Sequence, residues 1–197
     1  MSFNANKAGR TGANRIIDGV IRAIKLDKTF YAEVEHDVSY QQDALTIVVV
    51  VSIIGAIGAF LGVLIGRGSF LGAIGTLIWQ AVWGVAAFYL LTYLIQWVGT
   101  RFFKGQGDVG EVQRCLGFAY APRILGILAI IPCIGWLAAL AGWLWSMVTS
   151  YVAVKEALDQ DDTKAVLTIV VSFVAVIVVG AIISAILALI GIAGSVI

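Results

Sequence analysis

Charged residues are scarce in this chain. Lys, Arg, Asp and Glu together make up 13% of its 197 residues, whereas 60% are hydrophobic. Soluble proteins average about 25% charged and about 45–50% apolar residues. This composition excludes an ordinary soluble domain and an intrinsically disordered chain. A formal net charge of only +1 also excludes a strongly acidic or basic binding module.

Residues that commonly carry chemistry are also rare. The two cysteines, Cys115 and Cys133, lack Cys-x-x-Cys spacing, and the single histidine, His36, lies among three acidic residues. One histidine without fixed partners makes a poor metal site, so a solvated helix face explains it better. No nucleophile–base pair, carboxylate pair, phosphate-binding loop or nucleic-acid signature is recognisable. We therefore expect no enzyme activity, cofactor, metal site or nucleic-acid partner.

The chain is rich instead in long uncharged runs, at 44–66, 68–100, 124–154 and 165–197. About 20 helical residues cross the hydrocarbon core of a bilayer, so each run can hold a transmembrane helix. The third run is long for one span, and Pro132 and Gly135 interrupt it. We therefore expect an all-α, polytopic transmembrane helix bundle of five spans, at 44–65, within 70–98, about 118–131, 136–154 and about 163–190.

Two amphipathic helices are expected outside the spans. Over residues 14–38, apolar side chains recur near the 3.6-residue period, and such a helix before a span most often lies at the membrane interface. Asp108 and Glu111 have the spacing of a capping box, which predicts a second short helix in the mid-chain connector. The predicted organisation is a cytoplasmic tail and interfacial helix over 1–43, followed by a five-span domain over 44–197.

The positions of lysine and arginine favour five spans over four. With five spans and a cytoplasmic N-terminus, every Lys and Arg except Arg67 lies on the cytoplasmic side. With four spans, Lys155 and Lys164 move to the outside. Cytoplasmic loops of membrane proteins carry an excess of Lys and Arg, so we expect the five-span arrangement.

Few polar residues fall inside the expected spans. Gln80 and Gln96 lie towards opposite ends of the second span, where interhelical hydrogen bonds would explain them. The absence of Asp, Glu and Lys from the spans argues against a proton-coupled pump or ion-coupled carrier. Arg123, next to Pro122, is the exception, and it either snorkels to the cytoplasmic headgroups or lines a functional cavity. We favour snorkelling, because roughly one helical turn separates it from the interface.

Small residues recur at every fourth position in two spans. Gly58, Gly62 and Gly66 form one such series, and Gly180 and Ser184 belong to another. This spacing lets transmembrane helices approach closely. Packing between helices of the same chain is the simpler interpretation, and homo-oligomerisation is the alternative.

A series of short motifs follows the connector. Ala119-Tyr120-Ala121-Pro122 precedes a short apolar span, Pro132 follows it, and the next span contains three tryptophans. A charged loop then closes with Thr163-Lys164-Ala165, and Thr29-Phe30-Tyr31 lies before the first span. Over roughly residues 15–190 this pattern resembles the Yip (Ypt/Rab-interacting protein) domain family, in its prokaryotic branch. Tyr120, Pro122 and Pro132 are therefore candidate structural or functional residues.

The resemblance implies five spans, a cytoplasmic N-terminus and, for the prokaryotic branch, a place in the plasma membrane. Eukaryotic relatives are non-enzymatic adaptors in vesicle trafficking that bind prenylated small GTPases. This chain has no long cytosolic extension and no Asp-Leu-Tyr-Gly-Pro segment before the first span, which puts a GTPase partner in doubt here.

Two functions remain open on the sequence. The first is a membrane scaffold or adaptor that organises membrane proteins or membrane trafficking, with lipids, other membrane proteins or further copies of the chain as partners. The alternative is a channel, transporter or lipid-handling conduit for uncharged or lipid substrates, suggested by short, Gly-rich and Pro-broken spans.

Overall fold

A computed structural model describes residues 12–131 and 135–189, and the elements in these ranges are helical. The prediction of an all-α chain is therefore confirmed for the described ranges. The elements are α1 (Gly12–Ile24), α2 (Lys28–His36), the 3₁₀ helix η1 (Val38–Tyr40), α3 (Gln41–Ile65), α4 (Phe70–Phe103), α5 (Val109–Ala119), the 3₁₀ helix η2 (Ala121–Ile130), α6 (Gly135–Ala157) and α7 (Asp162–Leu189).

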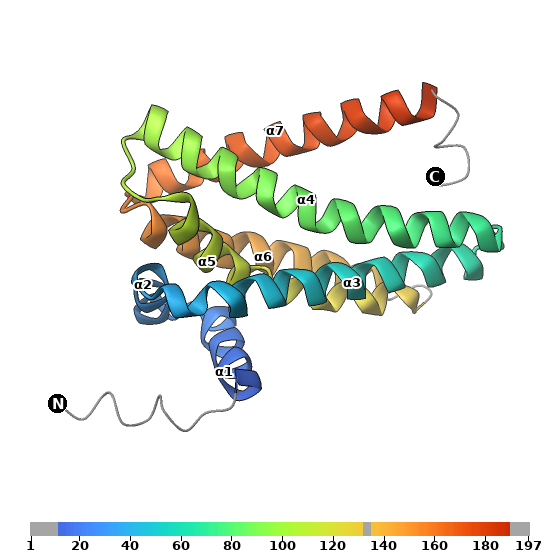
Figure 1. Ribbon diagram of the computed structural model, residues 1–197, viewed down its shortest axis with the longest axis horizontal. Coiled ribbons are helices and arrows are strands. Elements are labelled where there is room, and N and C mark those ends of the chain that lie inside the picture. The colour runs from blue at the N-terminus through green and yellow to red at the C-terminus, as the bar shows by residue number, and fades with distance from the viewer. Residues whose placement is uncertain (1–11, 132–134, 190–197) are drawn as a thin grey trace.

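Four helices are long and apolar enough to cross a membrane. They are α3 together with η1, α4, α6 and α7, and they coincide with four of the five expected spans. In Figure 1, α3 and α4 run side by side along the length of the molecule, and η2 lies between α3 and α6. Many of their large apolar side chains are exposed, which is expected of helices that face lipid tails.

The segment expected as the third span has a different structure. Instead of an α-helix over 118–131, α5 ends at Ala119 and residues Ala121–Ile130 form the 3₁₀ helix η2. Pro122 has no backbone N–H to continue the hydrogen-bond ladder of α5, which explains the ending. At about 2 Å per residue, η2 is about 20 Å long, shorter than the hydrocarbon core of about 30 Å. Five α-helical spans are thus not found among the residues described.

The predicted N-terminal amphipathic helix is two helices, and the expectation of one continuous helix over 14–38 is wrong. Leu26 has a φ of 60°, in the left-handed region, and breaks the chain between α1 and α2. Asp27 then caps α2 by accepting hydrogen bonds from the N–H groups of Thr29 and Phe30 at 3.0 and 3.3 Å. The apolar pattern in the sequence continues across Leu26, so the pattern did not indicate that the helix breaks there.

The helices outside the spans gather at one end of the bundle. Phe30 of α2 lies against Phe118 of α5 with ring centroids 5.1 Å apart, and Tyr40 lies 5.9 Å from Phe118. Trp145 of α6 donates Nε1–H to Ile24 O at 3.1 Å, which ties α1 to the bundle. The loop between α6 and α7 joins the same end, since Gln106 N–H donates to Leu158 O at 2.9 Å. The basic residues that the structure describes in 12–43, 100–120 and 155–164 therefore share one end of the bundle, and Arg67 lies at the other end.

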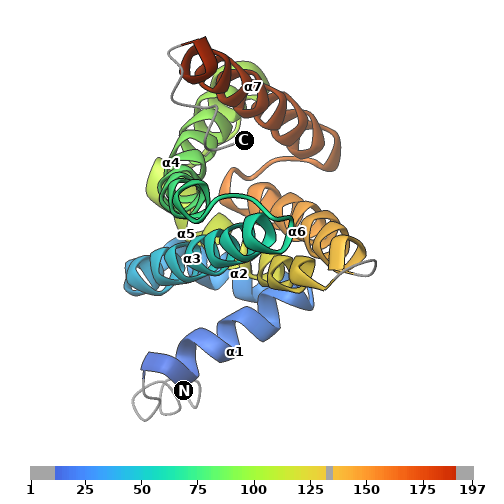
Figure 2. The same ribbon diagram turned by 90° about the vertical axis from the view of Figure 1, so that its right-hand side faces the viewer.

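Helix α7 stands apart from the rest of the bundle. Figures 1 and 2 show it packed beside α4 and separated from α3, while α1 projects from the opposite side. Gln160 fixes the start of α7: its amide donates to Gly99 O at 3.1 Å and accepts from Thr168 Oγ1 at 3.0 Å. Both bonds are buried, so this end of α7 is held firmly while much of its length stays exposed.

Candidate functional site

The end of α5 organises the candidate site. A capping box starts the helix, as predicted: Asp108 Oδ1 accepts from Glu111 N–H at 2.8 Å, and Glu111 Oε2 accepts from Asp108 N–H at 2.7 Å. At the other end, Arg123 N–H donates to Tyr120 O at 3.1 Å instead of continuing the α-helical ladder. The carbonyl of Ala119 is therefore left for partners outside the helix.

Two hydroxyl groups of α6 donate hydrogen bonds to that carbonyl oxygen. Thr149 Oγ1 donates to Ala119 O at 2.8 Å, and Ser146 Oγ donates to the same atom at 3.2 Å. Both side chains are fully buried. Buried polar groups in a transmembrane bundle must find partners within the protein, so these bonds hold α6 and the end of α5 together.

The same serine positions the intramembrane arginine. Arg123 Nε donates to Ser146 Oγ at 3.1 Å, and the guanidinium carbon lies 4.0 Å from the centroid of the Tyr120 ring. Tyr120 is buried and packs edge-on against Phe88, with the centroids 5.2 Å apart. Ser146 and Tyr120 thus hold the guanidinium in place from two directions.

Arg123 lines a cavity of about 310 Å³ between α3, α4 and the start of η2. A Cβ atom at Gly84 of α4 would lie 2.7 Å from Ser52 Oγ of α3, so the two helices meet closely at this level. The cavity combines apolar walls with the polar groups of three elements. Its lining residues are Val51, Ser52, Gly55, Ala56, Gln80, Trp83, Gly84, Ala87, Tyr120 and Arg123.

Three residues singled out in the sequence meet here, namely Gln80, Tyr120 and Arg123. For Arg123 the structure fits the cavity alternative, since its guanidinium bonds to α6 and lines the cavity. The sequence did not indicate Ser52 or Gly84 as part of the site. Ser52 is one of few polar residues in its span, and that signal could have found it.

The other polar and proline candidates lie elsewhere. Gln96 donates Nε2–H to Gly107 O at 3.4 Å, near the end of α4, away from Gln80. Pro122 is buried, and a Cβ atom at Gly142 of α6 would come within 2.6 Å of its carbonyl oxygen. Pro132 lies outside the described residues.

The small residues divide between packed and exposed positions. Gly58 is buried next to η2, with its Cβ position 3.6 Å from Gly126 O, and Gly180 faces Trp83, with its Cβ position 3.0 Å from the ring. By contrast, Gly62 is exposed and open, Gly66 is the exposed C-cap of α3, and Ser184 is exposed on α7. Neither glycine series forms a continuous helix contact within the described chain.

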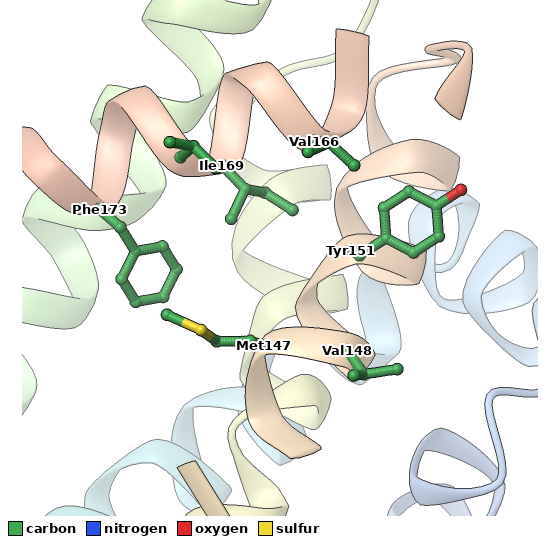
Figure 3. A pocket seen from close by; sticks show the side chains of 7 residues that line it. Met147, Val148, Tyr151, Val166, Ile169 and Phe173 are labelled. Atoms are coloured by element: carbon green, nitrogen blue, oxygen red, sulfur yellow. The ribbon is translucent and has the colours of Figure 1, made fainter. Parts of the chain in front are cut away.

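A second hollow lies between α6 and α7. It has a volume of about 310 Å³ and is lined by Met147, Val148, Tyr151, Val166, Ile169, Val170 and Phe173. Figure 3 shows side chains of the two helices facing one another across it, with the hydroxyl of Tyr151 pointing away. We call this hollow the α6–α7 groove. Its surface is apolar, in contrast to the cavity at Arg123.

The histidine and cysteines do not form a metal cluster in the parts of the chain that the structure describes. His36 is exposed, with Nδ1 3.1 Å from Ala32 O. The thiol of Cys115 is buried and donates to Tyr31 O at 3.6 Å, and burial raises its pKa well above the ordinary value. Cys133 lies outside the described residues.

A buried carboxyl group lies on α2, at the end of the bundle where α2 packs against α5. Arg114 donates Nε–H to Val34 O at 3.0 Å and Nη2–H to Glu35 O, so the backbone of α2 takes up its charge. No ion pair joins Arg114 to the Glu35 carboxylate among the described residues, and this side chain, with Oε2 3.7 Å from His36 Nδ1, is only 8% exposed. Burial raises the pKa of Glu35 to about 7, an effect that His36 partly opposes.

The model of the Yip1 domain family matches residues 28–194, most of the chain, including α2 to α7. No curated protein and no solved structure matches the chain. The match agrees with the motifs around Tyr120 and Pro122 and with the four span-like helices. The chain belongs to the Yip1 domain family and is a multi-pass membrane protein of that type.

Proposed function

We propose that the protein is a non-enzymatic membrane scaffold or adaptor, which binds transmembrane helices of other proteins in the α6–α7 groove. The groove itself is the observation that carries this proposal. Its walls are apolar side chains from two helices that meet only near one end. Val166, Val170 and Phe173 form the α7 wall, and the exposed face of α7 continues beyond them through Val174 and Ile177.

A partner helix would be stabilised at this groove by close side-chain packing. Lipid tails are as apolar as leucine, so helices associate in a bilayer through close packing rather than through the hydrophobic effect. A hollow between two helices offers a fixed shape that a side chain can fill, whereas a flat helix face does not. Ile169, at the base of the groove, is 7% exposed and gives it a floor.

The proposal includes a topology. Segments 12–43, 100–120 and 155–164 lie at one end of the bundle, and we place that end in the cytoplasm of a prokaryotic cell, at the plasma membrane. From that end α3 leads outward and α4 returns, η2 carries the chain to the far side again, α6 returns it to the cytoplasmic end, and α7 leads outward. Cysteine accessibility at Ser69, in the α3–α4 turn, and at Lys104 tests the two sides.

Affinity purification tests the scaffold. The chain is tagged, isolated in mild detergent from its native membranes, and compared with Val170→Trp, which fills the groove, and Val49→Trp, a matched change on the exposed face of α3. We expect defined membrane partners or further copies with the parent and with Val49→Trp, and their loss with Val170→Trp. A partnerless monomer, or partners that are indifferent to Val170→Trp, would contradict the proposal.

The second candidate function is a conduit for lipids or uncharged molecules, and η2 favours it. Ten residues of 3₁₀ helix beside a polar cavity are unusual at membrane depth, where irregular backbone occurs next to protein or a cavity. Purified chain in liposomes is assayed for lipid scrambling and for flux of small uncharged solutes. Rates equal to those of empty liposomes would end this alternative.

A further inference from the structure

We propose that the cavity at Arg123 is a binding site for a phosphate group. The inference concerns the cavity alone and does not depend on the scaffold or the conduit. Arg123 supplies the charge, and Gln80 and Ser52 supply neutral polar groups from α4 and α3. The ligand is recognised by its phosphate oxygens, whether the group belongs to a phospholipid or is free.

The depth of the cavity makes the charge significant. Ser52 lies about 16 Å along α3 from Gln41 and about 20 Å from Ile65, at about 1.5 Å per residue. The cavity is therefore near the middle of a membrane-spanning helix. A charged side chain at that depth costs several kilocalories per mole unless it is paired, and such residues usually serve a function.

Within the protein, the charge of Arg123 is only partly satisfied. Nε donates to Ser146 Oγ, and the guanidinium lies over the Tyr120 ring. No carboxylate lies within ion-pair distance of it among the described side chains, where every ion pair found involves other basic residues. A guanidinium has five N–H donors, so those on the terminal nitrogens remain available on the cavity side.

The geometry suits an oxyanion with several oxygens. A guanidinium presents its terminal N–H groups as a planar fork that fits phosphate with two parallel hydrogen bonds. Because Ser146 and Tyr120 fix the plane of this fork, little ordering is required when a ligand binds. A volume of about 310 Å³ exceeds that of a single phosphate group, which leaves room for the start of a glycerol or other ester substituent.

The cavity is accessible from outside the bundle. Gly55 and Gln80, on its rim, are both exposed. A Cβ atom at Gly55 would meet nothing within 4 Å. A side chain at position 55 therefore begins in open space at the rim of the cavity. Gly62, on the same helix, is equally open but does not line the cavity, and it provides a matched control.

The test uses the full chain purified in a non-ionic detergent that contains no phosphate. One arm adds phosphatidylglycerol and, as its counterpart without phosphate, diacylglycerol with the same acyl chains, and native mass spectrometry counts bound lipid. The other arm titrates inorganic phosphate against sulfate and chloride, with tryptophan fluorescence as the readout, since Trp83 lines the cavity. Each arm includes Arg123→Gln, Arg123→Lys, Gly55→Met and the controls Arg101→Gln and Gly62→Met.

We expect the phosphate-bearing ligand to bind the parent, Arg101→Gln and Gly62→Met alike. Arg123→Gln and Gly55→Met should each weaken binding at least about tenfold, because charge-assisted bonds are lost or the cavity is filled. Arg123→Lys should fall between, since it keeps the charge but loses the fork. Binding in the lipid arm identifies a phospholipid as the source, and binding in the phosphate arm alone identifies a free anion.

Two results would overturn the proposal. One is equal binding of phosphatidylglycerol and diacylglycerol together with no phosphate response. The other is phosphate-dependent binding that both Arg123→Gln and Gly55→Met leave unchanged. Gly55→Met keeps the test valid if Arg123→Gln fails to fold, because its Cβ position is open and both partners of the Arg123–Ser146 bond are retained.

Discussion

Gly142 allows α6 to pack against the start of η2, and we predict that Gly142→Ala destabilises the protein. A Cβ atom at this position would lie 2.6 Å from Pro122 O and 2.9 Å from Leu125 Cβ. Both are closer than van der Waals contact, and the first is a backbone atom that no rotamer change can move. Helix α6 and η2 must therefore separate by several tenths of an ångström.

The size of the effect follows from two opposing terms. Overpacking at a close contact costs about 1–3 kcal/mol. Alanine in a helix interior recovers about 0.5–1 kcal/mol relative to glycine. The difference lies between about 0 and 2.5 kcal/mol, so we expect a net loss of unfolding free energy of about 1 kcal/mol. Gly62→Ala is the matched control, because its Cβ meets nothing within 4 Å, and it should gain about 0.5–1 kcal/mol from helix propensity alone.

Titration of the purified chain with a denaturing detergent in mixed micelles measures the difference. Trp143 and Trp145 lie on α6 close to Gly142, so tryptophan fluorescence reports the transition where the change is made. If Gly142→Ala matches or exceeds the parent in stability, as we expect for Gly62→Ala, then α6 and η2 are not in close contact at Pro122. The positioning of Ser146 towards Arg123 would then need another explanation.

Three further predictions concern the end of the bundle where α2 packs against α5. The pKa of Glu35 is raised to about 7 from about 4.5, so the folded state holds the proton more tightly than the unfolded state. The contribution of Glu35 to stability should be complete below about pH 4.5 and should fall by at most about 3 kcal/mol as pH rises through 7. A pH series with Glu35→Gln should lack this fall, and an equal slope in both would refute the assignment. Asp108→Ala removes the bond to Glu111 N–H and should cost about 1 kcal/mol in the same titration, so an unchanged midpoint would contradict a role for the cap. In a Cys133→Ser background, maleimide should label Cys115 only after unfolding, because the thiol is buried and its pKa is raised; rapid labelling of the folded chain would show that it is accessible.

Local signals in the sequence were enough for most of the helices. The capping box at Asp108 and the charge-free runs correctly predicted α5 and four long helices, because these depend on backbone propensity and on the cost of charge in lipid. The break at Leu26 escaped prediction, since a left-handed leucine is held by its surroundings and has no compositional signature. Pro122 was recognised as special, but its effect, a 3₁₀ continuation, depends on packing against α3 and α6.

The cavity illustrates what the sequence could not provide. Arg123, Gln80 and Tyr120 were each conspicuous, but their meeting depends on contacts between distant parts of the chain. Ser146, 23 residues after Arg123, holds the guanidinium inward. The sequence gives no sign of that bond, and it placed Arg123 one turn from the interface, where snorkelling is the natural expectation. Polar residue types could therefore be read from the sequence, whereas their assembly into one site could not.

The two hollows in this bundle differ in their lining, so the ligands proposed for them should be selected by different interactions. The α6–α7 groove is apolar, so protein and lipid chains compete there on shape, and side-chain volume should govern binding. The cavity carries a fixed charge in surroundings of low dielectric constant, where an unpaired ion is costly, so charge should govern binding there. Val170→Trp and Arg123→Gln change one property each, at separate places. Because the two substitutions share no contact, their effects should be independent if the sites are independent. Any coupling between them has a direct route through α6, where Ser146 bonds Arg123 and the next residue, Met147, lines the groove.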